Sequence, residues 1–392
     1  MDHADIVAVA AAALAPPGKE PVTLRLADIV VDYPGAACVI LRCTPMMPSP
    51  DIPSTVIVKW WNERGGHFRH EWSALEFLAR VPAAQDLVPR LYGGDAGAEL
   101  LVLEDLGDAA EQLLGNVLTS TDPERAEAAL VAFNQALGRL HASTIGRAEE
   151  YRRIRESRGA HAVSRHAIHR LDAALQALPG LVAAIGVRVS PALEREVRAA
   201  IKAIHTPGPF LTFTHGDATP GNAFYTGERA RLFDLETADF RHALLDGAFA
   251  RMRYLYSVWA RRVPQDLQRR SLAAYRRELV CGCPAAADDG VFAHALLACS
   301  AGWLAALCAH LPSVMEADKR FGRSTWRQRI VAGLDHFVTL ADDLGHFEAL
   351  AGGAGDMARR LRHHWSTVDC TLPPYEAFIE QESSAGGPSE GR

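Results

Sequence analysis

Three polar residues in the second half of the chain combine a possible proton acceptor with two possible metal ligands. Asp217 and Asn222 lie five positions apart in the run 214–222, THGDATPGN, and Asp234 follows after a turn and a short apolar stretch. The carboxylate of Asp217 can accept a proton from an attacking hydroxyl group. The amide of Asn222 and the carboxylate of Asp234 are oxygen ligands of the kind that Mg²⁺ prefers. The pattern therefore predicts chemistry on a magnesium-bound nucleoside triphosphate.

The segments that flank this run favour the chemical interpretation over a solvated surface turn. Gly and Asp are common in turns, so the run alone fits either interpretation equally well. The stretches 210–214, 223–225 and 230–233 are short and rich in β-forming apolar residues, with a turn at 226–229. This order predicts strand, loop, strand, turn, strand. The two acidic groups and the amide would then lie at the ends of adjacent strands, directed at one point.

Lys59 is a charged residue inside the apolar run 55–61, TVIVKWW. The chain uses lysine at only four positions, which are 19, 59, 202 and 319. An unpaired ammonium group in a buried strand is unfavourable, so we expect Lys59 either to bind a ligand or to reach solvent from a strand end. If it binds a ligand, replacing it with Met would cost little stability, because the burial cost of the charge would disappear.

These motifs together resemble the aminoglycoside phosphotransferase and choline kinase superfamily, relatives of the protein kinases. The resemblance runs from about residue 20 to 345 and is densest at 214–246. It implies that Asp217 is the catalytic base of the His-Gly-Asp-x-x-x-x-Asn loop. It also implies that Asn222 and Asp234, the latter in Asp-Leu-Glu, are the Mg²⁺ ligands.

The resemblance further implies an ATP site in the first third of the chain. Lys59 would hold the α- and β-phosphates and pair with Glu71, with Glu76 as the rival partner. The strand 100–104 would lead into a hinge, where backbone groups near Glu104 to Leu106 hydrogen-bond the adenine edge. A buried strand followed by an ordinary Gly turn is the alternative for this segment.

The remaining positions implied by the resemblance are structural. Asp246 would accept hydrogen bonds from the backbone of the catalytic loop and so fix His215 and Asp217, and His215 would orient that loop. His141 is interpreted as a packing residue. The chain departs from the family in the loop that covers the phosphates, since 33–37 contains one glycine instead of Gly-x-Gly-x-x-Gly. Phosphate-loop residues are therefore not assigned.

Composition bounds the class of protein. The chain has 392 residues, of which 48% are hydrophobic and 22% charged, and a net charge of −6, so nothing indicates a nucleic-acid partner. Its seven cysteines are odd in number and scattered, which favours a reducing, cytoplasmic environment over a disulfide framework. No stretch approaches the ~18 uninterrupted apolar residues of a membrane span, and residues 8–14 predict a small helix rather than a signal peptide.

The order of elements predicts an α+β, bilobal protein-kinase-like fold. A small mixed β-sheet with one helix would form an N-lobe over 20–106, and a large, mainly helical C-lobe would span 107–380, followed by a disordered tail at 381–392. The expected helices of the second part are 123–142, 149–177, 191–204, 244–260, 265–279, 290–310, 325–343 and 345–364. Ser324 is expected to cap the helix from 325, and Arg323, Arg327 and Arg329 to lie on a solvated face rather than to bind an anion.

The predicted function is ATP- and Mg²⁺-dependent transfer of the γ-phosphoryl group to a hydroxyl group of a small molecule. An aminoglycoside, a choline-like alcohol, a sugar, an amino alcohol or a macrolide would each fit, and the sequence leaves the oligomeric state open. Candidates for gripping a cationic acceptor are Glu236, Asp239, Asp335, Asp342 and Asp343. Two alternatives remain: a catalytically silent nucleotide-binding module of the same fold, and a metal-dependent hydrolase that uses Asp217, Asp234 and His215.

Overall fold

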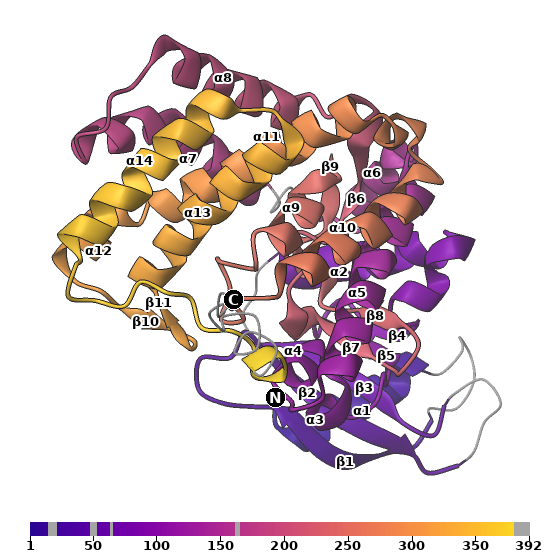
Figure 1. Ribbon diagram of the computed structural model, residues 1–392. Coiled ribbons are helices and arrows are strands. Elements are labelled where there is room, and N and C mark those ends of the chain that lie inside the picture. The colour runs from indigo at the N-terminus through magenta and orange to yellow at the C-terminus, as the bar shows by residue number, and fades with distance from the viewer. Residues whose placement is uncertain (15–21, 48–52, 63–65, 161–164, 380–392) are drawn as a thin grey trace. The chain divides into compact units, whose positions relative to one another are not determined.

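The computed structural model describes residues 1–14, 22–47, 53–62, 66–160 and 165–379 (Figure 1). The predicted tail at 381–392 lies outside these residues. The chain divides into two compact units. Unit 1 comprises Met1–Asp108, Glu149–Val163 and Arg231–Ala238, and unit 2 comprises Ala109–Ala148, Ser164–Ala230 and Asp239–Arg392. The sequence analysis expected a single boundary at 106/107, whereas unit 1 also contains the two later segments Glu149–Val163 and Arg231–Ala238.

Unit 1 is built on a five-stranded antiparallel sheet in the order β1-β2-β3-β5-β4. Its strands are β1 (Leu24–Val31), β2 (Cys38–Pro45), β3 (Val56–Trp61), β4 (Leu91–Asp95) and β5 (Leu100–Glu104). The sequence had suggested a mixed sheet, and this prediction was wrong, because all strand pairs of the sheet are antiparallel. Short connections join β1 to β2 and β4 to β5, and the longer connection after β3, which contains a helix, places β4 at the far edge beyond β5.

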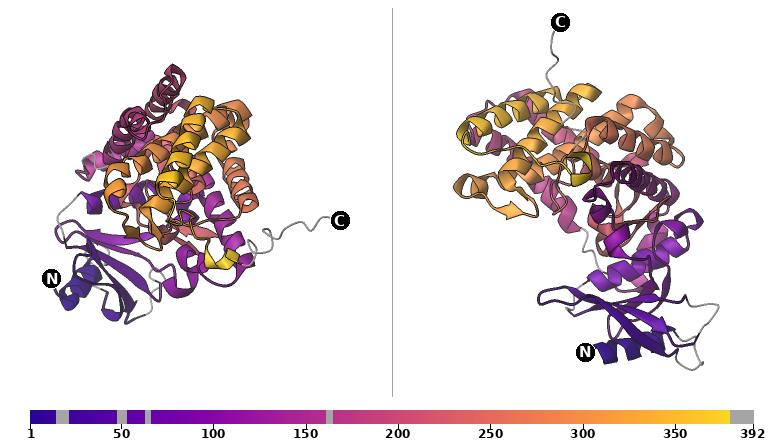
Figure 2. Two further views of the ribbon diagram at one scale, coloured as in Figure 1. Left: turned by 60° about the vertical axis from the view of Figure 1, so that its left-hand side comes forward. Right: turned by 60° about the horizontal axis from the view of Figure 1, so that its bottom comes forward.

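The two faces of this sheet have different partners. Helix α1 (His3–Leu14) packs against one face of the sheet (Figure 1, Figure 2). There Ile6 and Leu14 join a core with Val58 and Val102. Because side chains alternate along a strand, Lys59 points to the opposite face from Val58. Helix α2 (His67–Ala79) supplies the partner of Lys59 there, as described below.

Unit 2 is mainly helical. Its helices are α3 (Ala109–Gln112), α4 (Leu114–Leu118), α5 (Pro123–Thr144), α7 (Arg165–Ala184), α8 (Pro191–His205), α9 (Leu244–Arg251), α10 (Gln265–Val280), α11 (Asp289–Cys308), α12 (Leu311–Glu316), α13 (Trp326–Leu344) and α14 (Glu348–His364). Its short strands are β6 (Leu211–Thr214), β7 (Ala223–Tyr225), β9 (Asp239–His242), β10 (Arg320–Phe321) and β11 (Ser324–Thr325). Two elements contain a boundary between the units, α6 (Ala148–Ser157) and β8 (Ala230–Leu232). The predicted α+β class is confirmed.

Helix α11 is apolar enough and long enough to cross a membrane by length and composition alone. However, 83% of its most apolar 18-residue window is buried inside the protein. It contacts α7, α8, α9 and α13, as the central helix of a helical core does.

Three local predictions were wrong. The expected helix 149–177 is interrupted after α6, where Gly159 has a φ of +63°, a conformation that favours glycine and ends helices. The expected helix 244–260 ends at Arg251, because Arg253 and Tyr254 have φ values of +60° and +52°. Thr325, rather than Ser324, caps α13, in a capping box with Gln328.

His242 on β9 is a buried imidazole that accepts a hydrogen bond. It is 2% exposed and stacks on Phe210, with ring centroids 5.1 Å apart. The Leu244 backbone N–H donates to its Nδ1 atom at 3.1 Å. Burial lowers the pKa of His242 to about 3, with His141 adding to the shift. The folded protein therefore holds this ring neutral well below its usual pKa.

We expect His242 to contribute to acid destabilisation. Because the folded-state pKa lies below the unfolded-state value, only the unfolded chain binds this proton between about pH 6.5 and pH 3. The free energy of unfolding should then fall with decreasing pH by up to about 1.4 kcal/mol per unit from this group. His242→Asn keeps an acceptor for Leu244 N–H but does not titrate. Urea unfolding at pH 5 and 7.5 should show a smaller pH dependence for this variant; an equal dependence would contradict the assignment.

Candidate functional site

The residues singled out from the sequence fall into two groups, one in each unit. Lys59, Glu71 and Asp234 come together in unit 1, whereas Asp217, Asn222 and their supporting residues come together in unit 2.

Lys59 is held between two carboxylates. Its Nζ atom lies 2.6 Å from Glu71 Oε2 and also donates to Asp234 Oδ1. Lys59 is 5% exposed and Glu71 1%, so this ion pair is shielded from water and from salt. The predicted rival, Glu76, instead pairs with Arg80 on its own helix and with Arg158.

Asp234 owes its position to an unusual backbone conformation. Its φ and ψ are +64° and +59°, the left-handed region, which Asp tolerates better than most residues. The 3₁₀ turn Leu235–Thr237 starts directly after it and packs against α2. The strand β8 thus ends in a sharp change of direction that turns the carboxylate toward Lys59.

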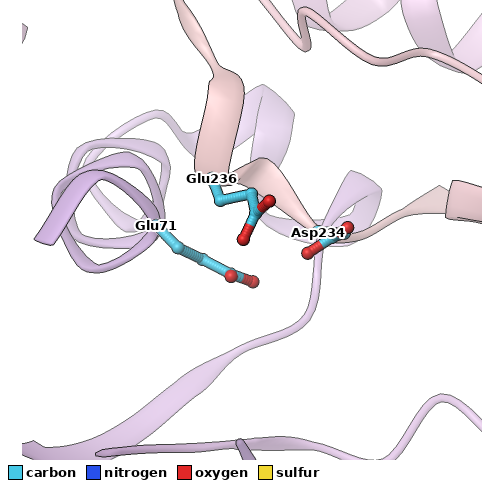
Figure 3. Close-up of side chains that lie close together, drawn as sticks. All are labelled: Glu71, Asp234 and Glu236. Atoms are coloured by element: carbon cyan, nitrogen blue, oxygen red, sulfur yellow. The ribbon is translucent and has the colours of Figure 1, made fainter. Parts of the chain in front are cut away.

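Glu236 belongs to the same cluster, which the sequence did not predict. Carboxylate oxygens of Glu71, Asp234 and Glu236 lie within 4.8 Å of one another, and Figure 3 shows the three side chains converging. The sequence suggested Glu236 only as a grip for a cationic acceptor. Its spacing of two residues from Asp234 was the available signal, because the intervening tight turn returns its side chain to the same point.

The electrostatics of this cluster favour a cation. One ammonium group faces three carboxylates, so the cluster is negative when all are ionised. Burial raises the pKa of Glu71 to about 7 despite the opposing effect of Lys59. Burial alone would lower the pKa of Lys59, but Glu71 and Asp234 outweigh it and hold that pKa above its usual value. Burial, and then Asp234, raises the pKa of Glu236. Hard oxygen donors with excess negative charge suit Mg²⁺.

The loop 214–222 holds Asp217 at the surface of unit 2. Asn222 Nδ2 donates to Asp217 Oδ2 at 3.0 Å and to the Asp217 carbonyl oxygen at 2.9 Å. Asp217 is exposed, so a substrate can reach its carboxylate. A Cβ atom on Gly221 would lie 2.5 Å from the indole nitrogen of Trp259. The close approach of that ring therefore requires glycine within the loop.

Asp246 organises the first half of this loop from below. It is 3% exposed and accepts from the backbone N–H of His215 at 2.6 Å and of Gly216 at 3.2 Å. Burial would raise its pKa, but hydrogen bonding to His141 and the nearby histidines lower it overall. The Asp217 N–H in turn donates to His215 Nδ1 at 3.4 Å.

His141 does more than pack. Its Nε2 atom lies 3.2 Å from Asp246 Oδ2, and its Nδ1 atom lies 2.8 Å from the Tyr275 hydroxyl oxygen. The interpretation as a packing residue was therefore incomplete, because a fully buried imidazole needs hydrogen-bond partners.

The predicted hinge at Glu104 to Leu106 begins at the last residue of β5. The Glu104 side chain is occupied by Arg231, and its backbone N–H donates to the Arg90 carbonyl at 2.8 Å. Contacts to a nucleotide base would therefore involve other backbone groups of 104–106.

The late arginine segment differs from the prediction at Arg329. This side chain is fully buried and donates to the carbonyl oxygens of Leu255, Ser257 and Phe321. Arg323 is exposed, as expected of a solvated face. Two of the acidic residues that were candidates for binding a cationic acceptor are engaged in ion pairs, Asp335 with Arg362 and Asp343 with Arg269.

The contacts of Lys59 reverse the expectation that Met would be tolerated. Lys59→Met leaves Glu71 buried without its counterion, beside two further carboxylates. We expect a loss of about 3 kcal/mol in unfolding free energy, measured by urea denaturation at pH 8. Lys202→Met, on the exposed face of α8, is the matched control and should be near neutral.

The double variant Lys59→Met/Glu71→Gln should recover part of this loss, because it removes the unpaired charge. An unchanged or increased stability of Lys59→Met alone would show that the ion pair contributes nothing to folding.

A family model described as "Phosphotransferase enzyme family" matches residues 67–281, more than half of the chain. No curated protein matched the chain. Similar solved structures include a choline/ethanolamine kinase family protein from Mesorhizobium loti (15% identity, 84% of this chain and 92% of that one covered, TM-score 0.44). Another is choline kinase LicA from Streptococcus pneumoniae (11%, 80% and 94%, 0.42).

A third solved structure is an aminoglycoside-3'-phosphotransferase of type VIII (16% identity, 70% of this chain and 93% of that one, TM-score 0.36). These similarities are too low to assign an acceptor. The family match covers α2 with Glu71, the loop with Asp217 and Asn222, and Asp234. The chain therefore belongs to the phosphotransferase enzyme family, as its motifs indicated.

Proposed function

We propose that this protein transfers the γ-phosphoryl group of ATP, with Mg²⁺, to a hydroxyl group of a small molecule. The observation that carries the proposal is the buried lysine held by Glu71 and Asp234. Such a fixed ammonium group suits the α- and β-phosphates of a nucleotide, because it needs no reorganisation when the charge arrives. Backbone groups at 104–106 would bind the adenine edge.

Asp217 is the proposed base. The hydroxyl oxygen of the acceptor attacks the γ-phosphorus, the bond from that phosphorus to the β,γ-bridging oxygen breaks, and ADP leaves. The proton of the hydroxyl group passes to Asp217. The hydrogen bond from Asn222 and the fixed backbone at His215 and Gly216 orient this carboxylate. Most of the rate enhancement would come from positioning and charge stabilisation.

Asp234 and Asn222 are the proposed Mg²⁺ ligands, and their carboxylate and amide oxygens fit that ion. Bound Mg²⁺ would neutralise charge on the phosphate oxygens. We also propose that the protein is cytoplasmic and has no nucleic-acid or membrane partner, which its composition supports. Choline-like alcohols, aminoglycosides, sugars, amino alcohols and macrolides are the acceptors to screen first.

Asp217→Asn should abolish phosphoryl transfer while nucleotide binding and stability persist. Loss of a general base typically lowers the rate by about 10²–10⁴-fold. ATP consumption with an active acceptor measures the rate, and thermal shift with Mg-ATP measures binding. Asp266→Asn, at an exposed position on α10, is the matched control. Near-normal turnover by folded Asp217→Asn protein would refute the assignment.

The same two measurements on the unmodified protein separate the alternatives. Stabilisation by Mg-ATP without turnover of ATP across the acceptor screen would favour the silent module. Stabilisation by Mg²⁺ alone, with no effect of ATP, would favour the hydrolase.

Asp234→Ala should weaken Mg²⁺-dependent nucleotide binding more than Asn222→Ala does, with a larger shift of the Mg²⁺ midpoint, because a charged carboxylate binds the ion more strongly than a neutral amide. Titrating Mg²⁺ at fixed ATP gives the midpoint for each variant. If Asp234→Ala leaves this midpoint unchanged, the ion binds elsewhere.

A further inference from the structure

The segment after β5 is closed into a ring by an arginine that the proposed reaction does not use. Arg42 on β2 donates from Nε to Asp105 Oδ2 at 2.7 Å and from Nη2 to Asp105 Oδ1 at 3.2 Å. The same Nη2 donates to the Gly107 carbonyl oxygen at 2.7 Å. The Gly107 N–H donates back to Asp105 Oδ1 at 3.1 Å. The residues on both sides of Leu106, Asp105 and Gly107, are therefore held in place by hydrogen bonds.

A second arginine holds the start of the same segment. Arg231 on β8 forms a two-pronged pair with Glu104, at 2.6 Å from Nη1 to Oε1 and 2.7 Å from Nη2 to Oε2. It also donates to the Val88 carbonyl oxygen at 2.5 Å. The Arg90 N–H donates to Glu104 Oε2 at 3.0 Å. Arg231 thus ties the end of β5 to the strand that runs directly into Asp234.

These contacts are more specific than ordinary surface ion pairs. The side chains are at most about a quarter exposed, with Asp105 at 8% and Arg231 at 19%. A planar guanidinium group that grips a carboxylate through two bonds fixes orientation as well as distance. Both pairs act on the end of β5 and the residues directly after it. A binding segment ordered in advance loses less entropy when its ligand arrives.

We propose that Arg42, Asp105, Glu104 and Arg231, here called the hinge bracket, are positioning residues for the base of the nucleotide. Their side chains hold the backbone of 104–106 in the conformation that hydrogen-bonds the adenine edge, and these side chains do not touch the nucleotide themselves. The inference rests on the proposed function, since it needs an adenine nucleotide at this segment. Because Arg231 also supports β8, it links the position of the base to that of Asp234.

The test compares two ligands that differ in the base. Isothermal titration of the full chain, with Mg²⁺, measures the affinities of a non-hydrolysable ATP analogue and of tripolyphosphate, which lacks adenosine. Arg42→Gln should lower the affinity for the nucleotide analogue by roughly five- to tenfold and leave the affinity for tripolyphosphate unchanged. Arg42→Lys retains the charge but not the planar guanidinium group that makes two bonds to Asp105. Its nucleotide affinity should lie between those of the unmodified protein and Arg42→Gln. In steady-state assays the KM for ATP should rise more than kcat falls. The control is Arg152→Gln, in an exposed ion-pair cluster of α6.

Arg231→Gln should behave differently from Arg42→Gln. It should reduce the preference for the nucleotide over tripolyphosphate and also shift the Mg²⁺ midpoint, because β8 leads to Asp234. If Arg42→Gln does not fold, Asp105→Asn replaces it, since this variant keeps the shape and an acceptor for Gly107. Equal weakening of both ligands, or a lower melting temperature with the preference intact, would show that the bracket is only structural. If the unmodified protein binds neither ligand, the proposed function itself fails.

Discussion

The geometry of the cluster formed by Lys59, Glu71, Asp234 and Glu236 depends on one buried ion pair, Lys59 with Glu71. A charge inside a sheet is tolerated only where an opposite charge meets it at close range. This requirement fixes the packing of α2 against the sheet, because Glu71 must reach β3. It also fixes where the chain returns at Asp234, whose carboxylate shares the same ammonium group. One ammonium group on β3 thus contacts carboxylates from α2 and from the segment after β8, the latter 175 residues further along the chain.

The loop 214–222 in unit 2 is held by a different kind of interaction. There the backbone is the object of the hydrogen bonds, and Asp246 supplies the acceptors. Histidine and tyrosine side chains beneath it complete the network. The indole ring of Trp259 against Gly221 restricts the loop from another direction. Asp217 can therefore remain exposed while the backbone that carries it is constrained.

Local sequence patterns predicted much of this arrangement. Strand periodicity located β3 and Lys59, and the His-Gly-Asp motif located the loop between β6 and β7. What failed depended on partners far away in the chain. Nothing near Arg329 indicates that distant carbonyl groups will bury it, and nothing near His141 identifies Tyr275 and Asp246 as its partners. The break after α6 and the end of α9 depend on single residues with positive φ, which a helical periodicity does not reveal.

Unit 1 is assembled from three stretches of chain that end at residue 238. A ribosome must therefore synthesise the chain through residue 238 before this unit has all its parts. Until then the ammonium group of Lys59 lacks one of its two carboxylate partners, Asp234. The Tyr151 hydroxyl group likewise lacks its acceptor, the Ala238 carbonyl oxygen. Contacts of such long sequence separation form slowly, because the intervening chain must first be closed into a loop. An isolated fragment of residues 1–108 would accordingly be an incomplete domain, and recombination between relatives at that boundary would separate residues that fold as one unit.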